Sequence, residues 1–99
     1  MKQHRYRVTV EHLSDAQGAP SKYKQPLSFE VGNHDDIFDI VQRTHERVNL
    51  DATSATAFAV GLKLFSEVML ENGKHQIFQE FAPHFRTFMK NLKKMPEGS

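Results

Sequence analysis

Three consecutive polar residues, His34, Asp35 and Asp36, are the densest group of side chains with acid–base or metal-binding chemistry in the chain. A metal ion or a proton transfer needs further groups from other elements, because consecutive residues cannot all face one point. The triplet opens a helical stretch, and the free amides of a first helical turn favour acidic and amide side chains. Helix capping, by Asn33 or Asp35, is therefore preferred over an ion site.

Six histidines are many for a chain of 99 residues, but their spacing matches no metal motif. No two stand four apart, the spacing that places two imidazoles on one helix face, and no HExxH segment occurs. We interpret them as separate surface side chains: His4, His12, His34, His45, His75 and His84. The sequence also contains no glycine-rich phosphate loop and no nucleophile turn. It therefore indicates no catalytic, cofactor-binding or metal site and favours a protein that is not an enzyme.

A group of basic and aromatic residues could bind single-stranded nucleic acid through phosphate contacts and base stacking. Its members are Arg5, Arg7, Lys22, Tyr23 and Lys24. The chain has 13 basic and 12 acidic residues, a formal charge of +1, whereas nucleic-acid-binding domains usually carry a strong basic excess. A solvated face is the preferred interpretation, and the five residues remain a candidate interaction surface.

Two stretches of alternating apolar and polar residues predict an antiparallel hairpin, with strands over residues 4–13 and 27–31. Residues 14–26 contain Gly and Pro and predict a loop, longer than the two to five residues common in hairpins. Gly32 is expected to end the second strand.

Apolar residues at helical spacing predict helices over residues 34–48, 52–72 and 75–94. Pro83 is expected to break the third of these, because proline lacks the amide of a helix interior. Residues 95–99 are expected to fray.

The second helical stretch is apolar over most of its circumference, which predicts that it is buried on more than one side. Asp51 or Thr53 can cap its start. Gly61 lies within it and costs about 1 kcal/mol relative to alanine. That cost predicts a close helix crossing at this position.

These elements predict a single α+β domain over residues 1–99 with the order β-β-α-α-α, in which a two-stranded antiparallel hairpin packs on a three-helix layer. Such a hairpin is marginal alone and leaves two edges unpaired. A second copy can pair edge to edge and extend the sheet, and the apolar second helix can join the same contact. A homodimer is therefore expected. Charged residues such as Arg5, Arg7 and Lys24 can also blunt the edges of a monomer, so that alternative stays open.

The absence of cysteine suits a reducing compartment. The first residues have no apolar signal-peptide core, and no stretch approaches the about 20 apolar residues that span a bilayer. A cytoplasmic protein without a membrane contact is expected.

Three segments resemble a small bacterial family: HRYRVTVEHL, FEVGNHDDIFDIV, and AVGLKLFSEVMLENGK followed by a phenylalanine-rich tail that ends in FMKNLKK. Over residues 4–94 the chain is similar to the family known as domain of unknown function 3861. The resemblance implies a bacterial, cytoplasmic, stand-alone protein. It implies no activity, and it transfers no functional residue.

The leading hypothesis is a non-enzymatic interaction or regulatory module, a homodimer that contacts another protein through the 14–26 loop or the helical surface. One alternative is a weak nucleic-acid-binding protein that uses the basic residues near the first strand. A second is a small enzyme, which would need a pocket where several histidines or carboxylates converge. No cofactor is expected.

Overall fold

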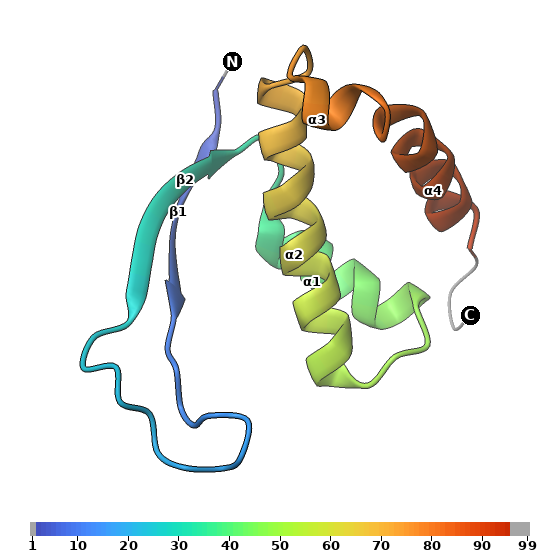
Figure 1. Ribbon diagram of the computed structural model, residues 1–99. Helices are drawn as coiled ribbons and strands as arrows, with labels where there is room; N and C mark the ends of the chain where they lie inside the picture. The colour runs from blue at the N-terminus through green and yellow to red at the C-terminus, as the bar shows by residue number, and fades with distance from the viewer. Residues whose placement is uncertain (1, 96–99) are drawn as a thin grey trace.

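The computed structural model describes residues 2–95, and its elements are a hairpin followed by helices (Figure 1). In chain order they are β1 (His4–Val10), β2 (Leu27–Asn33), α1 (Ile37–Arg47), α2 (Ala52–Glu71), α3 (Gln76–Gln79) and α4 (Ala82–Lys94). The two strands pair antiparallel. The predicted α+β fold, an antiparallel hairpin followed by helices, is confirmed.

The hairpin carries its apolar side chains on one face, because the register places alternate residues opposite one another. Tyr6 pairs with Val31, and Val8 pairs with Phe29. Contrary to expectation, Gly32 does not end β2, which continues through Gly32 to Asn33. A Cβ at Gly32 would lie 2.8 Å from Cδ of Gln3. The glycine thus leaves room for the Gln3 side chain to cross toward α2.

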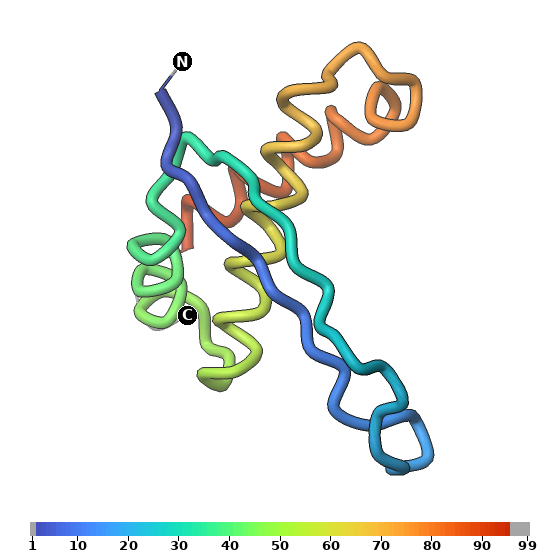
Figure 2. The backbone as a smooth tube through the Cα atoms, turned by 90° about the vertical axis from the view of Figure 1, so that its left-hand side faces the viewer, coloured from blue at the N-terminus to red at the C-terminus, as the bar shows by residue number. Residues whose placement is uncertain are grey.

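β1 ends at Val10, three residues before the expected position. Its last partner is Leu27, which follows Pro26, and proline has no amide to continue the ladder. The connecting loop has internal order: Asp15 Oδ1 accepts hydrogen bonds from the amides of Gln17 and Ala19, at 3.0 and 2.9 Å. Figure 2 shows this loop extending beyond the helices.

α1 begins at Ile37 because Asp36 is its N-cap and accepts hydrogen bonds from the amides of the first turn. The expectation that Asn33 or Asp35 caps this helix is therefore wrong. α2 has Asp51 as its N-cap, with Oδ1 accepting from the amide of Ser54 at 2.7 Å. Hydrogen bonds from the backbone amide and the side chain of Ser54 lower the pKa of the Asp51 carboxyl.

The last helical stretch consists of the single turn α3 and the longer α4. Pro83 lies in the first turn of α4, where its missing amide has no helical partner to lose. The described chain ends with Met95 as the C-cap of α4. Residues 96–99 of the expected frayed tail lie outside the described residues.

α2 occupies the centre of the molecule (Figure 1). α1 packs against it, the hairpin lies on one side and α4 on the other. Within residues 2–95, the buried apolar side chains are Ile37, Ala55 and Ala59. The core is therefore a thin seam between α1 and α2, and large apolar surfaces stay outside it.

Candidate functional site: a polar cluster and an apolar face

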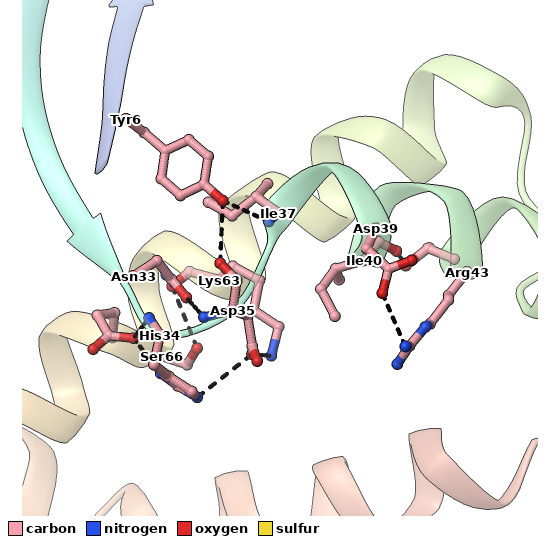
Figure 3. Close-up of polar contacts among 12 residues, drawn as sticks. Tyr6, Asn33, His34, Asp35, Ile37, Asp39, Ile40, Arg43, Lys63 and Ser66 are labelled. Carbon is pink, nitrogen blue, oxygen red and sulfur yellow. Dashed lines mark hydrogen bonds and ion pairs between the residues drawn. The ribbon is translucent and has the colours of Figure 1, made fainter. Parts of the chain in front are cut away.

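A polar cluster joins the end of the hairpin to the middle of α2 (Figure 3). Asn33 is fully buried at the end of β2. Its Nδ2 donates to the carbonyl of Lys63 at 3.0 Å, and its Oδ1 accepts from the amide of Asp35 at 3.0 Å. The Asn33 side chain thus holds the turn that leads into α1 and attaches this turn to α2.

Glu67 is a carboxylate that is only 4 % exposed. Its Oε1 lies 2.6 Å from Nδ1 of His34 and also accepts from the His34 amide at 3.3 Å. Its Oε2 accepts from Nε2 of Gln3 at 3.1 Å. A buried carboxylate is tolerated when it is paired and hydrogen-bonded in this way. When Glu67 is ionised its oxygens only accept, so Nδ1 of His34 is then the donor of this bond.

Asp35 and Lys63 form an ion pair beside this contact, with Nζ 2.7 Å from Oδ2. The hydrogen bond from Lys63 holds the pKa of the Asp35 carboxyl below its usual value, against the opposing effect of partial burial. Nε2 of His34 lies 3.5 Å from the same Oδ2. Acidic and basic groups therefore alternate through the cluster, in the order Lys63, Asp35, His34 and Glu67.

Tyr6 closes the cluster from the hairpin side (Figure 3). Its hydroxyl donates to the carbonyl of Asp35 at 3.1 Å and accepts from the amide of Ile37 at 2.9 Å. The phenol thereby satisfies an amide at the start of α1, while its ring stays on the apolar face of the hairpin.

The polar cluster brings together groups that could do acid–base chemistry, and sequence reasoning missed it. The sequence predicts His34 to be a separate surface side chain, whereas its ring pairs with Glu67. Lys63 and Glu67 stand four apart on α2, a spacing that places opposite charges on one helix face. This spacing is the signal in the sequence that points to the cluster. It does not identify the partners of Lys63 and Glu67, which lie about thirty residues earlier in the chain.

The chemical capacity of this cluster is limited by its internal bonding. His34, Lys63 and Ser66 line one wall of a cavity of ≈ 470 Å³ between α2 and α4. Ser66 Oγ donates to the Lys63 carbonyl at 3.4 Å, and Nε2 of His34 faces Asp35. Within residues 2–95, no group of three histidine or acidic side chains is arranged to hold a metal ion.

The remaining histidines do not converge with His34. His12 bonds to Ser21 in the loop, His45 bonds to Thr56, and His75 caps α3. His4 stacks on Tyr6 with ring centroids 6.2 Å apart. Each of these four therefore has a local structural contact.

The basic residues singled out in the sequence lie in two separate places. Arg7 pairs with Glu30 across the hairpin at 2.8 Å. Arg5 lines a cavity next to Gly32. Lys22, Tyr23 and Lys24 lie in the loop, where the Tyr23 ring meets His12 edge-on at 5.1 Å. Two of the five residues thus lie on β1 and three in the connecting loop.

A large apolar surface, here called the α2 face, extends from the hairpin across α2 to α4. Its residues are Phe29 and Val31 of β2, Phe58, Gly61, Leu64, Phe65 and Val68 of α2, and Phe81, Phe85 and Phe88 of α4. Two cavities, of ≈ 570 and ≈ 410 Å³, open on it, and Phe65 lines both. Phe29, Phe65 and Val68 are each at least 40 % exposed.

Aromatic rings make the contact between α2 and the C-terminal helices. The Phe65 ring meets those of Phe78, Phe81 and Phe85 at centroid distances of 5.9–6.1 Å. Phe58 meets Phe88 at 6.3 Å. Edge-to-face packing of this kind holds α4 against α2 and leaves the outer sides of the rings on the α2 face.

The exposed area of the chain is large for its mass. The chain exposes 7940 Å², whereas a compact monomer of 11.4 kDa exposes about 5,800 Å². Its radius of gyration is 15.9 Å, against about 13 Å for a compact domain of this length. The single chain therefore buries less surface than a stable monomer usually does.

α2 is long and apolar enough to cross a membrane, by length and composition alone. Within α2, an 18-residue stretch has a mean hydropathy of 1.2, and 17 % of that stretch is buried. α2 is the one such helix in residues 2–95. Core helices of soluble proteins also meet this criterion, so it is weak support for a membrane span.

Comparison with known proteins identifies the family. The family model DUF3861, described as a domain of unknown function with solved structure, matches residues 4–94. The chain belongs to this family. The resemblance inferred from the sequence is thereby confirmed, and DUF3861 brings no assigned activity with it.

A crystal structure of a protein of unknown function from Pectobacterium atrosepticum SCRI1043 is similar to this DUF3861 chain at 39 % identity. The match has a TM-score of 0.81 and covers 95 % of this chain and 100 % of that one. Among curated proteins, none shows significant similarity. The comparisons thus support the fold and the family and assign no function.

Proposed function

We propose that this protein is a non-enzymatic interaction module that acts as a homodimer, with the α2 face as the contact between the two copies. The observation that carries the proposal is the exposed apolar surface centred on Phe65 and Val68, next to a core of three small or medium-sized apolar residues. Large contiguous apolar patches on a protein surface mark interaction sites.

The amount of surface fits a second copy. The chain exposes about 2,000 Å² more than a compact monomer of its mass. Two chains that each bury this excess would form an interface of about 4,000 Å², within the range of obligate homodimers. The apolar character of the α2 face also matches obligate interfaces, which resemble a domain core cut in half.

A second copy explains the surface better than a lipid bilayer does. α2 carries Lys63 and Glu67, which are engaged by Asp35, His34 and Gln3 of the same chain. A helix spanning a bilayer would have to bring these charges into the hydrocarbon region. The polar side of α2 is instead occupied by the hairpin end and α1.

A pair of matched variants tests the proposed contact. Val68 and Leu70 are similarly exposed aliphatic residues of α2, but Val68 lies on the α2 face and Leu70 on the opposite side of the helix. We expect Val68→Lys to dissociate the dimer in sedimentation experiments and Leu70→Lys to leave it intact. Equal masses for both variants would contradict the proposal.

Concentration dependence supplies an independent test on the unmodified chain. A dimer whose folded state needs both copies unfolds at a temperature that rises with chain concentration. We expect the midpoint to rise between about 1 and about 100 µM chain. Addition of lipid vesicles distinguishes a second copy from a lipid bilayer as the partner of the α2 face. Flotation of the chain with neutral vesicles would favour the bilayer.

An enzymatic role is the second candidate, because His34 is oriented by Glu67 at the wall of a cavity. A carboxylate that orients an imidazole is a common part of general-base sites. Hydrolysis of p-nitrophenyl acetate that falls about 100-fold in Glu67→Gln would support it. Hydrolysis unchanged by that variant would leave the pair with a structural role alone.

The nucleic-acid hypothesis has less support. Arg7 is neutralised by Glu30, and the loop lysines are separated from Arg5 by the length of the hairpin. Phosphate contacts weaken steeply with added salt, so binding should be strongest at low salt. A gel shift with single-stranded DNA at low salt that shows no complex would end this hypothesis.

A further inference from the structure

Gly61 occupies a position in α2 that the single chain does not explain. A glycine inside a helix is unfavourable unless something needs the space of its missing side chain. No heavy atom of residues 2–95 outside the local helix backbone lies within 4 Å of a Cβ built at Gly61. The close helix crossing predicted from this glycine is therefore absent from the described chain.

The surroundings of Gly61 are those of a helix contact. It lines the ≈ 410 Å³ cavity together with Phe58, Phe65 and Phe88. Ala57, one turn earlier, is also exposed and small. The backbone of α2 is thus accessible at the bottom of a shallow apolar depression, where a second helix can approach closely.

The position of Gly61 along α2 has a symmetry consequence. α2 extends from Ala52 to Glu71, so Gly61 lies at its middle. In a two-fold dimer, residues on the axis meet their own copies, and the same patch serves both chains. A helix that crosses its own copy at its midpoint buries the largest length of both helices.

Resting on the proposed homodimer, we propose that α2 crosses α2 of the second copy at Gly61, with the two-fold axis passing beside this residue. The missing side chains let the two backbones come close, and Phe58 and Phe65 of each copy pack around the crossing. The occupant of the α2 face is therefore the same face of another chain.

Cysteine cross-linking tests this crossing directly, because the natural chain has no cysteine. A disulfide needs Cα atoms within about 7 Å, a separation that two helices reach only where they touch. We expect Gly61→Cys to form a disulfide-linked dimer under mild oxidation. The matched control is Thr56→Cys, an exposed residue on the side of α2 that faces α1, which should stay unlinked.

A second position keeps the test informative if Gly61→Cys disturbs the crossing. Ala57 lies four residues from Gly61, about 6 Å along the helix. Two copies of Ala57→Cys would then lie on either side of the axis, within reach of a short bismaleimide reagent. We expect this reagent to link Ala57→Cys and not Thr56→Cys.

The outcomes separate this inference from the homodimer itself. A chain that sediments as a dimer but links at neither Gly61→Cys nor Ala57→Cys would overturn the crossing and leave the homodimer standing. A chain that sediments as a monomer at all accessible concentrations would overturn both.

Discussion

The Oε1 atom of Glu67 lies 2.6 Å from Nδ1 of His34, so a buried carboxylate in α2 pairs with the imidazole that follows β2. This contact ties the hairpin end to the centre of the molecule across 33 positions of the chain. Phe65 and Val68 of the α2 face take no part in this contact. The polar cluster and the α2 face are neighbours, because Glu67 and Phe65 line the same ≈ 570 Å³ cavity.

Substitution of Glu67 should destabilise the fold more than substitution of Glu71. In Glu67→Gln, one amide group replaces an acceptor that serves Gln3 and His34, and a buried hydrogen-bonding group loses its partner. We expect a loss of about 1–3 kcal/mol in the free energy of unfolding, measured in urea. Glu71→Gln is the control: Glu71 is exposed and accepts only from Gln3, so its effect should stay within about 0.5 kcal/mol. Equal effects would contradict the role given to Glu67.

The ion pair of Asp35 with Lys63 should make stability depend on acidic pH. The pKa of the Asp35 carboxyl in the folded chain is below the ordinary value of 3.8. Between the lowered and the ordinary pKa, the unfolded chain therefore binds more protons than the folded chain. The stabilisation is therefore present above the ordinary pKa and is lost as the pH falls through the lowered one.

Urea unfolding between about pH 2 and pH 6 measures this term. Asp35 is about one third exposed, so solvent screening limits the contribution to about 1 kcal/mol or less. The difference between the natural chain and Asp35→Asn should shrink as the pH falls below 3.8. Asp39→Asn, which removes a surface pair with Arg43, is the control and should change stability by less than about 0.5 kcal/mol. A difference that grows in acid would contradict the sign.

The two tyrosines offer a matched pair of substitutions. Tyr6→Phe removes a hydroxyl that bridges Asp35 and Ile37, and it leaves the Ile37 amide without this acceptor. We expect a loss of about 1–3 kcal/mol in the free energy of unfolding. Tyr23→Phe alters an exposed loop ring and should have an effect within about 0.5 kcal/mol. A Tyr6→Phe chain as stable as the natural one would show that the bridge contributes nothing.

The Gly61→Ala substitution tests whether α2 is free at this position or crosses α2 of a second copy. The two cases predict stabilisation and destabilisation, respectively. On an isolated chain the substitution should stabilise by about 1 kcal/mol, because no described atom opposes the new methyl group. At a close crossing the same methyl groups push the helices apart and weaken the dimer. We expect weaker dimerisation in sedimentation equilibrium, and unchanged dimerisation for Thr56→Ala on the other side of α2.

Local patterns predicted the elements of this fold better than their association. Alternation of apolar residues from Tyr6 to Val10 indicated a strand because one face of the hairpin is apolar. The course of β2 through Gly32 was missed because it depends on Gln3, which needs that space to reach α2. Capping chemistry identified Asp51 as a possible cap but not Asp36, because several neighbouring polar residues could serve equally well.

The polar cluster depends on tertiary contacts that spacing cannot give. Glu67 is a charged residue of the mostly apolar α2, and it is buried by contacts with residues of the hairpin end. The apolar circumference of α2 did indicate contacts on more than one side. In the described chain, α1, the hairpin end and the phenylalanines of α4 all contact α2. Phe65 and Val68 nevertheless remain exposed. This exposed surface is the reason for proposing a second copy.

Native mass spectrometry of the purified natural chain at micromolar concentration tests the homodimer most directly. The proposed contact predicts that the main species of the natural chain has twice the mass of 11.4 kDa. In the Val68→Lys variant, the main species should have the mass of a single chain. A main species of 11.4 kDa for the natural chain, unchanged by added salt or by higher concentration, would contradict it.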